Sequence, residues 1–412
     1  MSTQLSKVKV VLFTCLLIVS LMASDGVTAD TTGVTENEIT VGLFHPITGP
    51  ASVLGVPVMQ AFMTVVNLTN EAGGVYGRKI KVFAEDDGNN PEKAKSAVKK
   101  LIYDNKVFLL QGSVSSLAAF AAKKEIEEAK VPWLAGSGTM DKIYVPTVPT
   151  TYGYTTTASS LGKVIVRFIL SKPDVKKIVF VYHYDEWGKA QLDPAVMELK
   201  SHERKNVEYI TEVLDRGITD ATPAVLRIKK YNPDAIGGIL YPQESAIFVR
   251  DAYKYGLKVP IAFSGAANDL RDLKKRSGIP ESVKWVFCAV ATTLCDSTLS
   301  DPKYSELTIA LKKYFPQGRI QNMNAYGFAY GKIFVEALRR SGKDLTREKF
   351  LDVMDNLRDF DVKVLLGNVS FSKTHHLAGV DYVFITLNKN GIEHFTDKSE
   401  WDPGIMRKRG WE

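Results

Sequence analysis

Residues 38–44, Glu38-Ile-Thr-Val-Gly-Leu-Phe44, form a short apolar run that is typical of a buried β-strand. The apolar spacing from Val53 to Glu71 is that of a helix, and the helix is expected to end at Gly73-Gly74. A second strand-like run, Lys79 to Ala84, follows. Strand, helix and strand in this order predict a βαβ unit, the building block of a parallel sheet covered by helices.

The same alternation continues along the chain, with one interruption. Residues 140–157 are irregular and rich in Thr, Pro, Tyr and Gly, and after them the alternation restarts. We therefore predict an α/β fold with two lobes, each a doubly wound parallel sheet. Helices are expected at 91–103, 115–129, 159–170, 188–202, 221–231, 243–255, 268–277, 302–315, 324–340 and 346–357, and strands at 106–110, 131–135, 177–182, 207–213, 234–240, 259–263, 284–289 and 380–387.

The length of the chain also requires two lobes. About 380 residues follow the N-terminal segment described below, and one hydrophobic core rarely organises that many. Irregular segments near 153–158, 288–292 and 364–370 separate the pieces and are expected to cross between lobes. We assign 30–154 plus 290–366 to one lobe and 155–289 plus 367–412 to the other.

Residues 1–29 have the order of a secretory signal peptide. Basic Lys7 and Lys9 precede an apolar run, Val10 to Ala23, and small residues lead to Ala29. The apolar run spans about 14 residues, whereas a membrane-spanning helix needs about 20. We therefore expect cleavage after Ala29 and a periplasmic or other extracytoplasmic location, with an uncleaved anchor as the alternative.

The charge distribution argues against nucleic acid as a partner. Loss of residues 1–29 removes two lysines and one aspartate and takes the formal charge from +7 to +6. The remaining basic residues are scattered among Glu and Ala on helix patterns, without an Arg-rich arm. No serine-nucleophile elbow, phosphate-binding loop or zinc motif occurs, so we expect no enzyme activity, catalytic residue, metal or cofactor.

Several stretches, taken in order, resemble a known family. They include Ile39 to Gly55, with its Thr-Gly-Pro turn, Asn70-Glu-Ala-Gly-Gly-Val-Tyr-Gly-Arg-Lys-Ile-Lys81, and Glu85-Asp-Asp87. Gly217-Ile-Thr-Asp220 and Asn232-Pro-Asp-Ala-Ile236 continue the likeness. The chain resembles the branched-chain amino acid-binding (Leu/Ile/Val-binding-like) proteins of bacterial ABC importers. The resemblance implies the type I periplasmic binding fold, with two lobes, three hinge crossovers and closure around a ligand.

The resemblance places a ligand carboxylate at two junctions of the first lobe. At Gln111-Gly-Ser-Val-Ser-Ser116 a helix begins, and its N-terminal N–H groups favour an anion. Ser115 aligns with the family's carboxylate-binding serine and Ser116 follows it, although a serine here also suits a helix cap. At the second junction Ser137, Gly138 and Thr139 fall where the family uses backbone groups and a threonine hydroxyl, and an ordinary polar turn is the alternative.

In the second lobe, Tyr241 aligns with a tyrosine that covers the ligand, and Trp187 with an aromatic residue beside a glycine. Packing within the lobe is the alternative for both. Two positions depart from the family. Gly265 stands where amino acid-binding members carry the acidic residue that pairs with the ligand's α-ammonium group, and Leu54 replaces an aromatic residue. Asp269 is about one helical turn away from the acidic position.

These observations predict a solute-binding subunit of an ABC importer, acting as a monomer beside a membrane permease. The ligand is a small carboxylate, either a hydrophobic amino acid or an aromatic or aliphatic acid without the α-amino group. The alternative is a ligand-sensing receptor or regulator on the same fold. Cys288 and Cys295 are either a disulfide or two buried thiols, and His375-His376 is interpreted as a surface turn.

Overall fold

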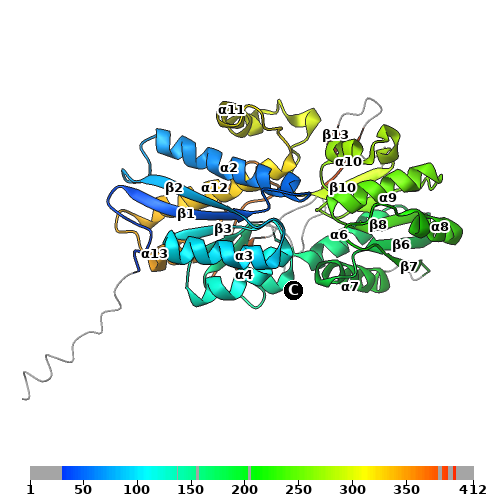
Figure 1. Ribbon diagram of the computed structural model, residues 1–412, viewed down its shortest axis with the longest axis horizontal. Coiled ribbons are helices and arrows are strands. Elements are labelled where there is room, and N and C mark those ends of the chain that lie inside the picture. Colours follow the sequence, from blue (N-terminus) through cyan, green and yellow to red (C-terminus); the bar gives the residue numbers. More distant parts are fainter. Residues whose placement is uncertain are drawn as a thin grey trace, which may run out of the picture. The chain divides into compact units, whose positions relative to one another are not determined.

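The computed structural model describes residues 30–136, 138–154, 157–202, 206–378, 383–387 and 393–395. The expected signal peptide therefore lies outside the described residues. Two sheets, each with helices on both faces, organise the chain (Figure 1). We call the six-stranded sheet with its helices the first lobe and the seven-stranded sheet with its helices the second lobe.

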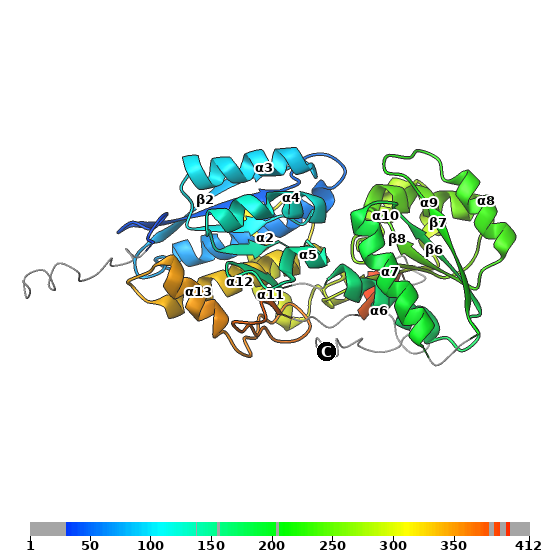
Figure 2. The same ribbon diagram turned by 90° about the horizontal axis from the view of Figure 1, so that it is seen from below.

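The first lobe contains strands β1 Glu38–His45, β2 Lys79–Asp86, β3 Leu109–Gly112, β4 Trp133–Ala135, β5 Thr151–Tyr154 and β11 Leu377–Ala378. Its helices are α2 Ser52–Glu71, α3 Pro91–Lys99, α4 Ser116–Glu128, α5 Asp141–Tyr144, α11 Ser305–Tyr314, α12 Asn322–Ser341 and α13 Arg347–Asp355, with short helices η1 Lys100–Asp104 and η4 Pro302–Tyr304. The short helix η3 Asp296–Thr298 contacts the seven-stranded sheet instead. The strand order is β11-β5-β4-β3-β1-β2, and all neighbours are parallel. Helices α3 and α4 cover one face, and α2, α12 and α13 the other (Figure 2).

The second lobe contains strands β6 Lys177–Tyr182, β7 Glu208–Val213, β8 Ala235–Ile239, β9 Ile261–Phe263, β10 Val286–Val290, β12 Val383–Leu387 and β13 Glu393–Phe395. Its helices are α6 Ala158–Leu170, α7 Glu186–Ser201, α8 Thr222–Tyr231, α9 Pro242–Lys254 and α10 Leu270–Ser277, with the short helix η2 Pro280–Val283. The order is β13-β12-β10-β9-β8-β6-β7, parallel except at β12, which runs antiparallel to both neighbours. The predicted α/β architecture of two doubly wound sheets is confirmed.

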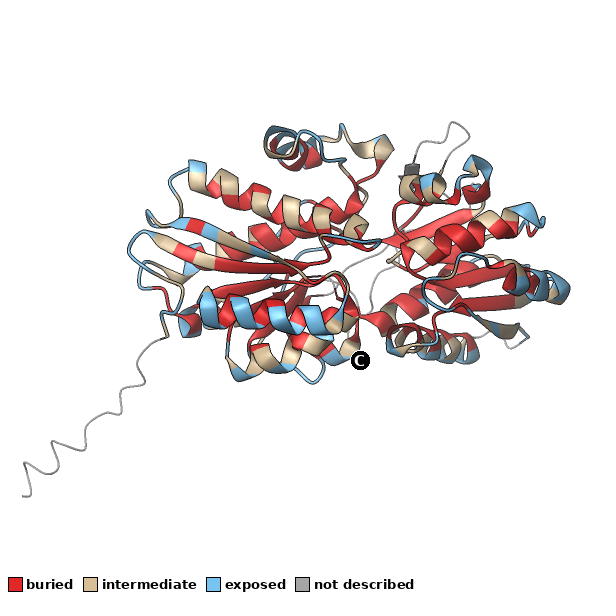
Figure 3. Ribbon diagram, viewed as in Figure 1, coloured by how far each residue is buried: buried red, intermediate tan, exposed pale blue. Residues whose placement is uncertain are grey.

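Burial follows from this arrangement. A parallel sheet covered on both faces hides its strands completely, so they are apolar throughout instead of alternating. Strands β3, β4, β5, β8 and β10 are buried along their whole length. The helices are buried on the side that faces the sheets and exposed on the other (Figure 3).

The chain crosses between the sheets three times: after β5, after β10, and between β11 and β12. The third crossing differs from the sequence prediction, which placed it near 364–370 and assigned 367–412 to the second lobe. Strand β11 instead pairs with β5, so residues up to Ala378 extend the first sheet. His376 holds this segment in place, because its ring stacks on Tyr152 at 4.1 Å and its Nδ1 donates to the carbonyl of Val148 at 2.7 Å. The interpretation of His376 as part of a surface turn was therefore wrong, since its side chain is buried.

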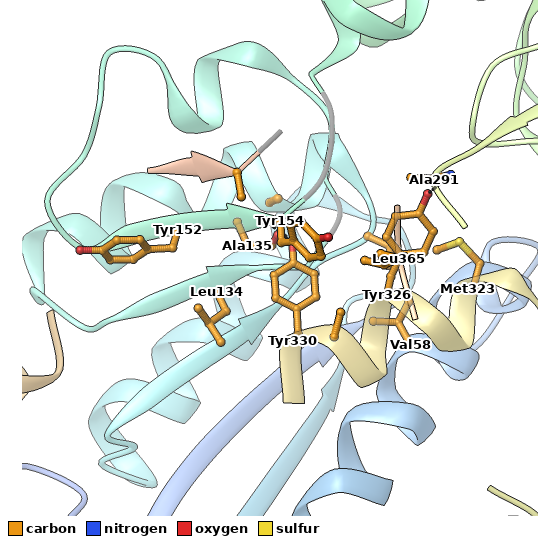
Figure 4. Packing of buried hydrophobic residues seen from close by; sticks show 14 of the residues in the cluster. Val58, Leu134, Ala135, Tyr152, Tyr154, Ala291, Met323, Tyr326, Tyr330 and Leu365 are labelled. Carbon is orange, nitrogen blue, oxygen red and sulfur yellow. Dashed lines mark hydrogen bonds between the residues drawn. The ribbon is translucent and has the colours of Figure 1, made fainter. Parts of the chain in front are cut away.

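Helix α12 connects the first lobe to two of these crossings (Figure 4). The hydroxyl of Tyr330 donates to the carbonyl of Ala135 at 2.7 Å and accepts the amide N–H of Tyr154 at 3.0 Å. The hydroxyl of Tyr326 accepts the N–H of Ala291, just after β10, at 3.1 Å. The helix therefore fixes strand ends β4 and β5 and the start of the second crossing, and these are the segments that position the candidate site.

Helices α2 and α12 pack unusually closely at Gly327. A Cβ atom added to this residue would lie 2.0 Å from the carbonyl oxygen of Val58. We therefore expect Gly327→Ala to lower the free energy of unfolding by about 1–3 kcal/mol, because the helices must separate. Urea denaturation measures the change. Gly265→Ala is the control, since an added Cβ there meets nothing nearer than 3.5 Å, and equal losses in the two variants would contradict the close packing.

Candidate functional site

The N-terminus of α4 lies at the carboxyl end of β3, and Ser115 caps it. The Ser115 hydroxyl oxygen accepts the N–H of Ala118 at 3.3 Å and donates to Oδ1 of Asn89 at 2.5 Å. The N–H of Ser115 donates to the hydroxyl of Ser113 at 2.9 Å. Ser115 is thus in the capping geometry that the sequence left as an alternative. Its buried side chain fixes the direction in which the first N–H groups of α4 point.

Ser116, Thr139 and Trp187 form a hydrogen-bonded chain between the two lobes. The N–H of Thr139 donates to the Ser116 hydroxyl at 2.7 Å, and the two hydroxyl oxygens lie 3.3 Å apart. The indole N–H of Trp187, at the start of α7, donates to the hydroxyl of Thr139 at 3.2 Å. The structure therefore brings together three predicted site residues from three separate segments. Gly138 precedes Thr139, and Ser137 lies outside the described residues.

Tyr241 extends this chain into the second lobe. The centroid of its ring lies 4.6 Å from that of Trp187. The guanidinium of Arg216 lies 4.2 Å from the centroid of the same Tyr241 ring. Arg216 also forms an ion pair with Asp185 at 2.6 Å. Burial raises the pKa of Tyr241, and the Arg216 charge opposes that rise. The hydroxyl is therefore a neutral hydrogen-bond group next to a fixed cation.

The neutral imidazole of His183 fixes the backbone of Tyr241 through a hydrogen bond. Its Nδ1 donates to the carbonyl of Leu214 at 2.7 Å, so Nε2 is free to accept the backbone N–H of Tyr241 at 3.1 Å. Burial lowers the pKa of His183. This tautomer places the end of β8 at a defined position, and sequence reasoning did not identify it because both partners of the ring are backbone groups.

Two buried polar side chains end the central strands of the first lobe. His45, at the end of β1, donates from Nε2 to Oε1 of Gln111 at 2.8 Å. Burial lowers the pKa of His45 to about 4, so the ring is neutral near pH 7. Nδ1 of His45 and Nε2 of Gln111 have no partner among the described residues. Polar residues at the ends of apolar strands were the available signal for this pair, and the sequence analysis missed it.

Asp86 is the last residue of β2 and Asp87 follows it, and the pKa values of the two carboxyl groups are shifted in opposite directions. Partial burial acts to raise the pKa of Asp86, but hydrogen bonds from Thr48, Ile47 and Gly88 outweigh it and lower the pKa to about 2. Burial raises the pKa of Asp87 to about 6, although the Ser113 side chain and the N–H of Asn89 oppose the rise. Oδ2 of Asp87 has no partner among the described residues. The turn after β2 therefore contains one carboxyl group with spare hydrogen-bonding capacity.

These two carboxyl groups predict opposite effects on stability. The folded-state pKa of Asp87 is above its ordinary value, so ionisation destabilises the fold increasingly from about pH 4 to pH 6 and fully above. Asp87→Asn is therefore expected to raise the free energy of unfolding by about 2–3 kcal/mol at pH 8 and to have little effect at pH 4. The pKa of Asp86 is lowered, so its stabilisation is present above about pH 4 and lost below. Asp86→Asn should destabilise the protein at pH 8.

Urea denaturation of both variants between pH 4 and pH 8 measures these effects. Each variant is the control for the other, since both replace a carboxylate by an amide at neighbouring positions. Equal pH dependence of the two variants would contradict the assignment of the raised pKa to Asp87.

Leu54 and Gly265 are not members of the contact chain from Ser116 to Tyr241. Leu54, in α2, lines a narrow crevice together with Pro242 and with Ala266 and the residues after it. A Cβ atom added to Gly265 would contact Leu161 at 3.5 Å and the carbonyl of Ala289 at 3.7 Å, which are ordinary distances. The absence of a side chain at 265 therefore leaves usable space beside α6.

Asp269 is committed to structure. It caps α10 by accepting the N–H groups of Arg271 and Asp272 at 3.1 and 3.0 Å. Oδ1 of Asp269 also accepts from Arg319 at 2.8 Å, across from the second lobe to the first. Asp269 therefore shares its charge with Arg319, and its Oδ2 has no partner among the described residues.

The described part of the chain contains neither a disulfide nor a cluster of metal ligands. Cys288 and Cys295 are buried thiols and do not form a disulfide. Within the described residues, no three His, Cys, Asp or Glu side chains gather in a way that could hold a metal ion.

Comparison with known proteins agrees with this geometry. A family model described as periplasmic binding protein matches residues 38–392. The chain belongs to the periplasmic binding protein family. The resemblance found in the sequence is thereby confirmed, and membership accounts for two lobes that meet through side chains at the carboxyl ends of their strands.

Individual relatives of this periplasmic binding protein are distant. The chain is 21% identical to Leu/Ile/Val-binding protein homolog 3 of Brucella melitensis biotype 1, over 84% of this chain and 90% of that protein. A Streptococcus pneumoniae branched-chain amino acid transporter substrate-binding protein, solved with isoleucine, has a TM-score of 0.76 and 20% identity, over 87% and 99% of the chains. A fatty acid ABC transporter substrate-binding protein from Thermomonospora curvata has a TM-score of 0.75 and 23% identity, over 92% and 95%. These structures show the shared fold.

Proposed function

We propose that this protein is the extracytoplasmic solute-binding subunit of an ABC importer and captures a small carboxylate that lacks an α-ammonium group. The glycine at position 265 is the observation that supports a ligand without an α-ammonium group. The family resemblance places at this position the acidic residue that pairs with an ammonium group, and glycine leaves no acidic side chain there. One structural relative was solved with isoleucine and another is named for fatty acids, so the fold accommodates both kinds of ligand.

The carboxylate seat that we propose is the N-terminus of α4 together with Thr139. A helix N-terminus presents N–H groups that have no partner within the helix, and its dipole favours negative charge. The hydroxyls of Ser116 and Thr139 lie beside it, 3.3 Å apart. Ser115 holds the helix start, and Gly138 directly precedes Thr139. Ser137 remains a sequence prediction, since it lies outside the described residues. Trp187 and Tyr241 would cover the ligand from the second lobe.

The acidic side chains near this seat already have partners. Asp185 pairs with Arg216, Asp269 pairs with Arg319, and Glu244 accepts the N–H of Gly217 at 2.8 Å. Asp87 and Asp269 each keep one carboxylate oxygen without a partner among the described residues, and the Asp269 charge is balanced by Arg319. A buried ammonium group without an anionic partner costs several kcal/mol, so the role of Asp87 is tested separately in the Discussion.

Closure of the lobes around the ligand is part of the proposed role in transport. Contacts from Thr139 to Trp187 and from Asp269 to Arg319 join the two lobes. A ligand that binds both lobes favours the closed form through its differential contacts, and a membrane permease can distinguish the closed form from the open one. Uptake of the ligand into vesicles that contain the permease separates this role from that of a sensing receptor.

A thermal-shift screen tests the ligand class. The probes are leucine, valine, 4-methylpentanoate, 3-methylbutanoate, benzoate and phenylacetate, each at millimolar concentration. A ligand present at 100 times its Kd stabilises the folded state by about 2.7 kcal/mol, which raises Tm by several degrees. We expect one or more of the ammonium-free acids to stabilise. Stabilisation by leucine or valine alone would contradict the proposal.

A further inference from the structure

A narrow crevice joins the two lobes next to the proposed ligand seat. Its walls are Val53 and Leu54 of α2 and, from the second lobe, Pro242 and the loop that follows Gly265. Pro242 directly follows Tyr241, so one wall of the crevice is bonded to an aromatic residue of the seat. In this structure it has room for about one water molecule.

Three buried amide side chains gather at this crevice, and we call them the amide cluster: Asn268, Gln321 and Asn322. Asn268 lines the crevice, and the other two lie at the start of α12. Gln321 reaches the crevice wall, because its Nε2 donates to the carbonyl of Val53 at 3.2 Å. The Nδ2 of Asn322 donates to the carbonyl of Asn268. Contacts to the backbone of both walls therefore tie the amide cluster to the crevice.

The amide cluster presents acceptors without donors. Oδ1 of Asn268 and Oδ1 of Asn322 are buried and have no hydrogen-bond partner among the described residues. Oε1 of Gln321 is buried as well and has only a capping contact with the N–H of Asn324, which is too loose for a hydrogen bond. The orientations of Gln321 and Asn322 are fixed, because turning either amide would place its oxygen against a backbone carbonyl oxygen. Nδ2 of Asn268 lies 3.0 Å from Sδ of Met323, which accepts weakly.

Unpartnered buried acceptors are costly, so a group that donates to them gains affinity. Leaving one such group unsatisfied costs about 1–3 kcal/mol, and native proteins satisfy nearly all of them with protein, water or ligand atoms. The charge beside the cluster is balanced, since Asp269 pairs with Arg319 at 2.8 Å. Asp269 itself lines the crevice, and its Oδ2 is a further buried acceptor without a partner among the described residues. Because Arg319 already balances this carboxylate, an uncharged donor satisfies the acceptors without adding an unbalanced charge.

We propose that the amide cluster receives an uncharged hydrogen-bond donor of the ligand, a hydroxyl group or an amide N–H. The ligand is then a carboxylic acid that carries a hydroxyl or amide function and no ammonium group. This inference rests on the proposed function, because the carboxylate seat at α4 holds the other end of the same molecule. On this proposal the amide oxygens bind an uncharged donor of the ligand. The family resemblance instead implies an acidic side chain at 265 that binds an ammonium group.

Calorimetric titration with matched probes tests the inference. Leucine, 2-hydroxy-4-methylpentanoate and 4-methylpentanoate share one carbon skeleton and differ only in the group at Cα. Benzoate and 4-hydroxybenzoate form a second pair with the hydroxyl at the far end. We expect at least one hydroxy acid to bind about fivefold or more tightly than its deoxy partner, and leucine to bind more weakly than either aliphatic acid.

Variants of the amide cluster test whether its side chains cause the preference for the hydroxy acid. Gln321→Met and Asn322→Leu should remove the advantage of the hydroxy acid while the deoxy acid keeps its Kd within about twofold. Asn324→Leu is the matched control, since both ends of that amide are paired, with Pro57 and Gln321. It is expected to lower Tm without changing the hydroxyl preference. Tm of each variant shows whether it folds, and Gln321→Met keeps the side-chain length if Asn322→Leu does not fold.

The outcomes separate the two proposals. Equal binding of hydroxy and deoxy acids in both pairs, or a hydroxyl preference that survives in both cluster variants, would overturn the role of the amide cluster and leave the carboxylate seat intact. Binding of none of the acids would overturn the proposed function and this inference with it.

Discussion

Thr139→Val is expected to weaken carboxylate binding by about 10- to 150-fold. The substitution keeps the shape of the side chain and removes the hydroxyl that joins Ser116 to Trp187. A hydrogen bond to a charged group contributes about 1.5–3 kcal/mol, which corresponds to that loss of affinity. Calorimetric titration with the best acid from the screen measures it.

Thr64→Val is the matched control. Thr64 is also buried, but its hydroxyl donates only to the carbonyl of Gln60 within α2 at 2.9 Å. Its affinity should stay within about twofold of the wild-type value. The carboxylate seat is wrong if Thr139→Val binds as tightly as this control.

Gly265→Glu is expected to change the preferred ligand. The backbone at this position is outside the left-handed region, and an added Cβ fits at ordinary distances, so the fold should tolerate a side chain. A carboxylate placed here would pair with an α-ammonium group and repel a second anion. We expect the affinity for leucine to rise by about tenfold or more, and the affinity for 4-methylpentanoate to fall.

The control for this variant is Gly265→Gln, which has the same size and no charge. Only the glutamate should favour leucine, and the difference should disappear below about pH 4, where the new carboxylate is protonated. A gain for leucine in both variants would show that size, and not charge, decides the preference.

Asp87 is the residue through which the chain could hold an ammonium group without an acid at 265. Its carboxyl group has a raised pKa of about 6 and one oxygen without a partner among the described residues. If a ligand cation paired with it, Asp87→Asn would abolish binding of leucine. On our account the wild-type protein binds leucine weakly, and Asp87→Asn leaves that affinity nearly unchanged.

The sequence predicted the fold because the βαβ pattern is long and repeated. Helices such as α2 and strands such as β1 have strong apolar periodicity, and most strand and helix positions follow from it. Strand β11 could not be predicted, since it has two residues and depends on its pairing with β5 and on the contacts of His376. The helix α5 and strand β5 lie within the stretch that the sequence analysis expected to be irregular, because Gly and Thr obscure the pattern there.

The candidate site was predictable where residues follow strands directly. Ser116, Thr139, Trp187 and Tyr241 each lie at a strand end or helix start, and the structure joins them in one chain of contacts. The partner of Asp269 was not predictable, because Arg319 is 50 residues away. The amide cluster also escaped detection, since an unpartnered oxygen has no sequence signal and becomes visible only when burial and hydrogen bonds are known.

The most direct test of the account is the affinity of the wild-type protein for leucine and for 4-methylpentanoate, measured by calorimetric titration at pH 7. The two molecules differ only in the α-ammonium group, so their ratio reports whether the protein supplies an anionic partner. We predict that 4-methylpentanoate binds at least about tenfold more tightly than leucine. Tighter binding of leucine would contradict the central claim that Gly265 has removed the recognition of an amino acid.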